Sequence, residues 1–351
     1  MDKIKAINFI ETSFLKELLI DNDITDISYN GHDIYFLHNY KGRQMSDIRI
    51  SEDEVKDFIR QIANLCEKQF SIQTPELNVS VGRYRVNAIH PSIAKRNNEG
   101  AINFAIRKSF GALITEKDPN FLNAKLICLF QVLLQSKMSI VIGGITGSGK
   151  TELQKYLISS LPKNTRVIVI DNILELDNLN IDDLDINIWQ SDDRNDDVSI
   201  QKLVKSALRS NPDWLIVAES RGKEMAEVLN SAMTGHPIIT TIHAFDVDSM
   251  PKRMTRMVLM SDAKQDYELV LDDINYNFHF YAYLKREIKG DGKVSRFIDE
   301  VAEIDEKGAK NTIYKVKNGQ RMVGHISHKM LEKLDYEQNE LFKSTFVGEK
   351  I

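Results

Sequence analysis

The stretch "IVIGGITGSGKTE", residues 140–152, decides the fold. A run of β-branched apolar residues opens into four glycines, and a lysine and a threonine follow. Gly144, Gly149, Lys150 and Thr151 fit the spacing G-x-x-x-x-G-K-[ST]. A glycine-rich segment that ends in a lysine and a threonine is typical of a loop that binds phosphate.

The flanking residues agree with that interpretation. Residues 139–142 predict a buried strand, and residues 151–161 predict a helix. Glycines let successive N–H groups point inward at phosphate oxygens, and the helix N-terminus adds partial positive charge. We therefore expect ATP as the ligand, with Lys150 at the β/γ-phosphates and Thr151 on Mg²⁺. The expected nucleotide-binding residues are Gly144, Ile145, Thr146, Gly147, Ser148, Gly149, Lys150, Thr151 and Glu152.

Composition places the chain among ordinary globular proteins. It has 351 residues, 42% of them hydrophobic and 28% charged, with a net charge of −5. The acidic balance argues against direct nucleic-acid binding. Two cysteines are too few for a disulfide framework or a four-cysteine zinc site, and a reducing cytosol is the simplest compartment. We find no signal-peptide core at the N-terminus and no apolar run of bilayer-spanning length, so a membrane role would be peripheral.

The first part of the chain predicts a smaller α+β domain over residues 1–108. A helical stripe precedes a hairpin at Asn30-Gly31, and a capping box at Ser51 and Glu54 opens a helix. Alternating segments at 77–92 and 101–110 read as further strands. Residues 109–121, with a glycine, a proline and charges, predict a linker.

Residues 122–351 predict an α/β P-loop ATPase domain. Four short apolar runs are of the buried parallel-sheet type, and helical segments separate them: "SIVIGGI", "RVIVID", "WLIVAE" and "PIITTIH". The C-terminal part predicts a strand pair around 290–292 and a last helix over 327–342.

Charged residues at the ends of these runs are the candidates for catalysis. Glu219 follows a fully apolar run, where α/β sites form, and His243 ends the fourth run. Asp171 and Glu175 lie in a stretch so rich in acids that most of them should only be solvated. A triphosphate also needs more positive charge than one lysine, and the candidate arginines are Arg83, Arg85, Arg107, Arg209 and Arg221.

Taken together, these motifs resemble the secretion ATPase superfamily, the traffic ATPases of type II and type IV secretion, conjugation and type IV pili. "GGITGSGKTE" matches its Walker A, "VIDNILEL" its Asp box, "ALRSNPDWLIVAESRG" its Walker B segment and "TGHPIITTIHA" its His box. "ITDISYNG" and "RYRVNAIHPSIA…INFAIRK" resemble its N-terminal domain, so the resemblance covers nearly the whole chain. It implies a C-terminal RecA-like P-loop NTPase domain and a PAS-like N-terminal domain.

The resemblance also implies roles for individual residues. Glu219 is the Walker B acid that meets Mg²⁺ through water, and Glu175 polarises the attacking water. His243 senses the γ-phosphate, and Arg209 belongs to the catalytic set. Arg107, and with it Arg83 or Arg85, reaches the phosphates from the N-terminal domain. The family further implies a homo-oligomeric ring, a hexamer, that works with inner-membrane secretion or pilus platform proteins at the cytoplasmic face.

Two departures from the family pattern are Asn172, where an acid is usual, and Ala218, where glycine is usual. The four-cysteine zinc module is absent from the sequence, which favours the compact branch of type IV secretion, conjugation and tight-adherence pilus ATPases. Two other functions stay open at this point. One is a DNA-translocating or helicase-like ring ATPase, and the other is a nucleotide-gated scaffold with little turnover.

Overall fold

A computed structural model describes residues 3–109, 121–172, 176, 181, 183–192, 195–261, 265–290 and 293–348. The chain divides into two compact units. Unit 1 comprises Met1–Phe110 and Glu287–Ser295, and unit 2 comprises Gly111–Arg286 and Arg296–Ile351. The expected linker, 109–121, lies almost wholly outside the described residues.

The segment Glu287–Ser295, which we expected within the C-terminal domain, groups with unit 1. Its backbone is bonded to unit 1, since the N–H of Val294 donates to the carbonyl of Tyr40 at 3.1 Å. A contact of this kind joins residues some 250 positions apart, and no local sequence pattern announces it.

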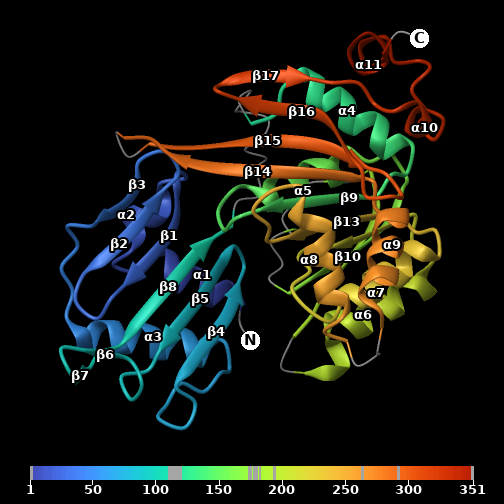
Figure 1. Ribbon diagram of the computed structural model, residues 1–351. Coiled ribbons are helices and arrows are strands. Elements are labelled where there is room, and N and C mark those ends of the chain that lie inside the picture. The colour runs from blue at the N-terminus through green and yellow to red at the C-terminus, as the bar shows by residue number, and fades with distance from the viewer. Residues whose placement is uncertain are drawn as a thin grey trace. The chain divides into compact units, whose positions relative to one another are not determined.

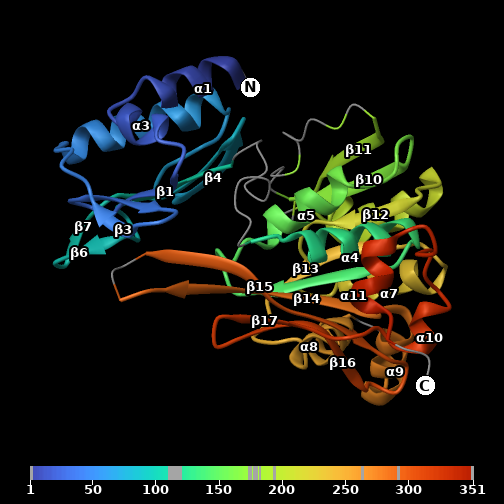
Figure 2. The same ribbon diagram turned by 90° about the horizontal axis from the view of Figure 1, so that it is seen from above.

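Unit 1 is an α+β unit with an antiparallel sheet in the order β3-β2-β1-β8-β5-β4. Helices α1 and α3 lie together over one face of the sheet (Figure 2). The predicted hairpin and capping box are both present, the latter with Ser51 and Glu54 bonding each other's backbone N–H. The elements are α1 Lys3–Glu11, α2 Lys16–Ile20, β1 Ile24–Tyr29, β2 Ile34–His38, β3 Gly42–Met45, α3 Glu52–Leu65, β4 Glu76–Val81, β5 Tyr84–Ile89, β6 Lys95–Arg96, β7 Glu99–Gly100 and β8 Asn103–Lys108.

Unit 2 is built on a nine-stranded sheet in the order β11-β10-β12-β13-β9-β14-β15-β16-β17. The strands from β11 to β14 pair in parallel, and β15 to β17 continue antiparallel. The strands are β9 Ile140–Gly144, β10 Arg166–Asp171, β11 Asp185–Gln190, β12 Trp214–Val217, β13 Ile238–Ile242, β14 Phe280–Ile288, β15 Val294–Ile304, β16 Lys310–Lys317 and β17 Gln320–Val323.

Two apolar cores lie on opposite faces of this sheet. Helices α4, α5 and α11 pack in one core, and α6, α7, α8 and α9 pack in the other. Figure 1 shows the second group clustered beside β10 and β13. The helices are α4 Ala124–Gln135, α5 Lys150–Ser159, η2 Asp196–Val198, α6 Ile200–Ala207, η3 Leu208–Ser210, α7 Met225–Met233, α8 Ser249–Val258, α9 Tyr267–Asn277, α10 His328–Leu331 and α11 Glu340–Phe346.

The structure confirms an α/β fold with four predicted parallel strands, and it corrects two details. Strand β11 stands at the edge of the sheet within the acid-rich stretch, where we predicted no strand. The single helix predicted over 327–342 is wrong, because α10 ends at Leu331 and the side chain of Asn339 caps a new helix, α11. Between them the N–H of Asp335 donates to Ser136 at 2.8 Å, which ties the chain to the end of α4.

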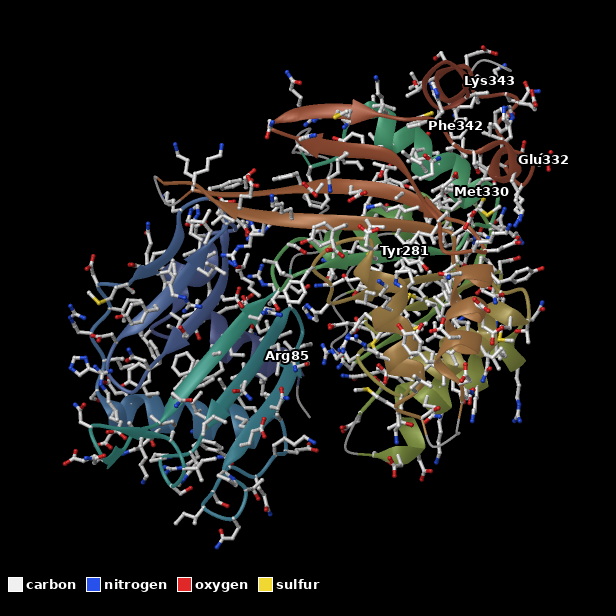
Figure 3. All side chains as sticks on the ribbon, viewed as in Figure 1. Arg85, Tyr281, Met330, Glu332, Phe342 and Lys343 are labelled. Atoms are coloured by element: carbon white, nitrogen blue, oxygen red, sulfur yellow. The ribbon has the colours of Figure 1, made fainter. Side chains whose placement is uncertain are left out.

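The C-terminal segment packs back onto unit 2. Met330 and Phe342 are buried in the core that α4 and α5 share, whereas Lys343 pairs with Glu340 at the surface (Figure 3). Among the described residues, no helix has the length and apolar character needed to cross a bilayer.

Candidate functional site

The glycine-rich loop joins the carboxyl end of β9 to the first turn of α5 and forms the centre of the site. Gly149 has φ +98°, and a Cβ there would lie 2.7 Å from the ring of Phe121. A Cβ on Gly144 would lie 2.5 Å from the Ser148 hydroxyl and 2.7 Å from the carbonyl of Leu284. Both positions therefore require glycine, because a side chain would clash with the walls of the loop.

Lys150 is the first residue of α5 and is 8% exposed. Its ammonium donates to the carbonyls of Gly144 at 2.9 Å and Ile145 at 3.2 Å, and it lies 3.3 Å from Nδ1 of His243. The charge is therefore held within the curl of the loop. Phosphate oxygens that carry full negative charge would compete well with these carbonyls for the same donors.

Glu219 and His243 follow the carboxyl ends of β12 and β13. Strand β13 pairs with β9, and β12 is the next strand on the same side. Nε2 of His243 lies 3.0 Å from one Glu219 oxygen, and the Arg221 guanidinium lies 2.8 Å from the other. The imidazole of His243 thus lies between the Lys150 ammonium and the Glu219 carboxylate, within ion-pair distance of the latter. The four side chains thus form one continuous polar chain beside the loop.

Charge within this chain keeps Glu219 ionised and His243 neutral. Burial opposes the ionised carboxylate, but the hydrogen bond and charge of Arg221, with the charges of His243 and Lys150, lower the pKa of Glu219. Burial first, and then the charge of Lys150, lower the pKa of His243 despite the attraction of Glu219. At neutral pH the site therefore holds a carboxylate next to a neutral imidazole.

Two further loop residues were predicted to bind the ligand. Thr151 is the second residue of α5, which places it at the helix N-terminus, and it is half-buried. Glu152 forms an ion pair with the buried Lys155 at 3.0 Å, one turn along the same helix. That pair gives Glu152 a structural role in α5. The hydroxyl of Thr151 and the carboxylate of Glu219 are oxygen ligands of the kind that Mg²⁺ prefers.

The remaining predicted catalytic residues of unit 2 lie in different parts of the chain. Asp171 ends β10 and is 2% exposed, so it is among the buried charged groups of unit 2. Glu175 lies outside the described residues. Arg209 is exposed in η3, which precedes the amino end of β12, whereas Glu219 follows its carboxyl end. Arg209 is therefore distant from the loop of its own chain.

The candidate arginines of unit 1 lie on and next to its sheet. Arg83 is paired with Glu11 at 2.8 Å and bonds the hydroxyl of Tyr84 at 2.9 Å. Arg85 on β5 (Figure 3) stands directly opposite Arg107 on β8 in the antiparallel register. Arg107 donates to Asp26 at 3.0 Å and remains 47% exposed. Two like charges opposite each other on one face repel, and the Asp26 carboxylate offsets part of that repulsion.

Three residues beside the loop were not predicted from the sequence, namely Phe121, Arg286 and Arg296. Phe121 lies next to Gly149, Arg296 of β15 donates to the carbonyl of Gly147, and Arg286 of β14 lies on the open side of Gly147. An alternating pattern such as "FYAYLKREI" could have signalled the strand β14. No local pattern could have signalled that β14 pairs with β9, which is 140 residues earlier in the chain.

Comparisons with known proteins agree with this geometry. Residues 116–276, which include the loop, Glu219 and His243, match the family model described as type II/IV secretion system protein. Over 132 residues the chain is 35% identical to the type IV secretion system protein VirB11 of Brucella suis. The matched part of the chain, residues 116–276, therefore resembles the type II/IV secretion system proteins.

Two other similarities extend over more of the chain than the VirB11 match, which covers 36% of this chain and 37% of its relative. An uncharacterized protein of Bacillus anthracis is 28% identical over 340 residues, 93% of this chain and 76% of that protein. The X-ray structure of the Legionella pneumophila ATPase DotB matches with a TM-score of 0.60 at 21% identity, over 84% of this chain and 80% of DotB. The latter similarity supports the two-part fold of a secretion ATPase.

Proposed function

We propose that this protein is a ring-forming motor of the secretion ATPase superfamily. It couples ATP hydrolysis to substrate secretion, conjugative transfer or pilus assembly at the cytoplasmic face of the cell membrane. The single observation that carries the proposal is the polar chain from Lys150 through His243 to Glu219. It brings together groups from three neighbouring parallel strands at the mouth of one phosphate-binding loop.

Each residue of this polar chain has a side chain suited to one part of ATP hydrolysis. Lys150 holds the β- and γ-phosphates as a point charge. Mg²⁺ would be held by Thr151 and, through water, by Glu219, and it would neutralise charge on the phosphates. The ionised Glu219 would accept hydrogen bonds from water on that ion. His243 lies between Lys150 and Glu219, so a phosphate that draws Lys150 away would also change the charge that Glu219 and His243 experience.

Three further roles are proposed on the family resemblance. Glu175 orients the attacking water, and Arg107, together with Arg85, contacts the γ-phosphate. Arg209, exposed on its own chain, would act at the site of a neighbouring subunit, which requires a closed oligomer. A hexamer is the expected ring, and membrane-embedded secretion or pilus platform proteins are the expected partners.

The variant Glu219→Gln tests the proposal because the amide keeps the shape of the side chain and loses its charge. We expect ATP binding close to that of the wild type and turnover lower by about 100-fold or more. Light scattering of this variant with ATP should show a closed ring, since nucleotide stays bound. Absence of Mg²⁺-dependent hydrolysis in the wild type would overturn the enzyme assignment. A protein that stays monomeric at micromolar concentration, with and without ATP, would overturn the ring.

A further inference from the structure

Two arginines from outside the recognised motifs converge on one residue of the phosphate-binding loop. Nε of Arg296 donates to the carbonyl of Gly147 at 2.8 Å. A Cβ built on Gly147 would lie 3.8 Å from Nη1 of Arg286 and 3.9 Å from its Cδ. Both arginines and the loop belong to unit 2, so the arrangement is internal to one compact body.

Strand register sets the position of both side chains. Leu284 of β14 lies opposite Gly144 of β9, and its side chain would lie 3.7 Å from a Cβ on Gly149. Because side chains alternate along a strand, Arg286 projects on the same face as Leu284. It lies two residues beyond Leu284, past the end of β9. Arg296 likewise shares a face with Ile298, which packs in the core of α5. The sheet therefore delivers two guanidinium groups to the face that carries the loop.

Part of the Arg286 guanidinium has no hydrogen-bond acceptor among the described residues. Its Nε is buried and has no hydrogen-bond partner among the described residues, and within them Arg286 makes no ion pair. A buried donor without an acceptor is costly, and a permanently charged fork is suited to phosphate oxygens. An anion beside Gly147 would supply the missing acceptor.

The side of the loop on which the arginines lie indicates which part of the nucleotide they meet. Glu219 and His243, the groups suited to the γ-phosphate, follow β12 and β13 on one side of β9. Arg286 and Arg296 come from β14 and β15 on the other side. A nucleotide whose γ-phosphate points toward Glu219 extends its nucleoside end in the opposite direction, past the arginines.

We propose that Arg286 donates to phosphate oxygens that ADP and ATP share, and that Arg296 is a positioning residue that fixes the Gly147 peptide beside them. The inference rests on the proposed function, because it assigns these residues to the same nucleotide. It makes the loop a two-sided clamp, with Lys150 on the helix side and Arg286 on the β14 side.

The test is a calorimetric titration of the full chain with ADP and with a non-hydrolysable ATP analogue. Arg286→Ala should weaken both ligands by a similar factor, about tenfold or more, as expected for lost charge-assisted hydrogen bonds. Arg286→Lys should recover part of the loss, since it restores the charge without the fork. Lys285→Ala is the matched control, because it removes one positive charge from the neighbouring position, which projects on the other face of β14.

The outcomes separate this inference from the proposed function. Wild-type affinity for both ligands in Arg286→Ala, alongside lost binding in Lys150→Ala, would overturn the role of Arg286 and leave the ATPase intact. A loss confined to the ATP analogue would place Arg286 at the γ-phosphate and overturn the assignment to shared phosphates. Absence of nucleotide binding in the wild type would overturn both proposals. Thermal unfolding of each variant shows that the fold is retained.

Discussion

The two sides of β9 carry opposite chemistry. On the β12 and β13 side, Glu219, His243 and Arg221 lie within ion-pair or hydrogen-bond distance of one another, and His243 also lies next to Lys150. On the β14 and β15 side stand two arginines, one bonded to the loop backbone and one with a buried donor that lacks an acceptor among the described residues. The first side holds acid, base and cation in a poised network, and the second offers only positive charge.

The difference separates catalysis from binding. A network in which pKa values are shifted by specific neighbours is suited to activating water and sensing phosphate. Arginines, which do not titrate in the working range, are suited to holding an anion whatever the state of the reaction. Substitutions on the β12 and β13 side should therefore lower turnover, and substitutions on the β14 and β15 side should weaken nucleotide binding.

Lys150→Ala should give the largest loss, because Lys150 is the residue that both sides share. We expect hydrolysis to fall below detection and nucleotide binding to weaken, since the variant loses the point charge at the β- and γ-phosphates. A phosphate-release assay and a titration with ADP measure the two effects. Lys163→Ala, which removes an exposed lysine paired with Asp183, is the control. Wild-type turnover in Lys150→Ala would remove the loop from the active site.

Arg107→Ala tests whether a positive charge of unit 1 also contacts the nucleotide. If Arg107 contacts the γ-phosphate, affinity for an ATP analogue falls by about 1–3 kcal/mol, the range of a charge-assisted hydrogen bond, while ADP affinity stays nearly unchanged. Parallel titrations with the two ligands decide the matter. Arg60→Ala removes an exposed arginine of the same unit that pairs with its helix neighbour Asp57, and it serves as the control. Equal losses for both ligands would take Arg107 away from the γ-phosphate.

Arg221→Ala should have the smallest effect, a change in the pH dependence of turnover. Arg221 lowers the pKa of Glu219, and it also helps to lower the pKa of His243. Its removal raises both values, so each group takes up a proton at a higher pH as the solution is acidified. The acidic limb of the kcat profile should move to higher pH, and Arg221→Lys should restore it. An unmoved acidic limb would mean that neither group limits the reaction in acid.

The sequence predicted one side of β9 far better than the other. Glu219 and His243 each follow an apolar run directly, so a strand prediction also places the side chain at the end of the sheet. Arg286 and Arg296 gain their position from the pairing of β14 with β9, a contact between distant segments that leaves no local pattern. Strand β11 was missed for a related reason, because an edge strand with half-exposed residues lacks the apolar run that signals a buried one.

Steady-state kinetics of Glu219→Gln and Arg286→Ala, measured side by side, test the central claim most directly. We expect Glu219→Gln to lower kcat by about 100-fold or more with little change in KM. We expect the loss in Arg286→Ala to fall chiefly on KM, which should rise about tenfold or more. A large fall in kcat at unchanged KM in Arg286→Ala, matching that of Glu219→Gln, would contradict the division of the site into a catalytic and a binding side.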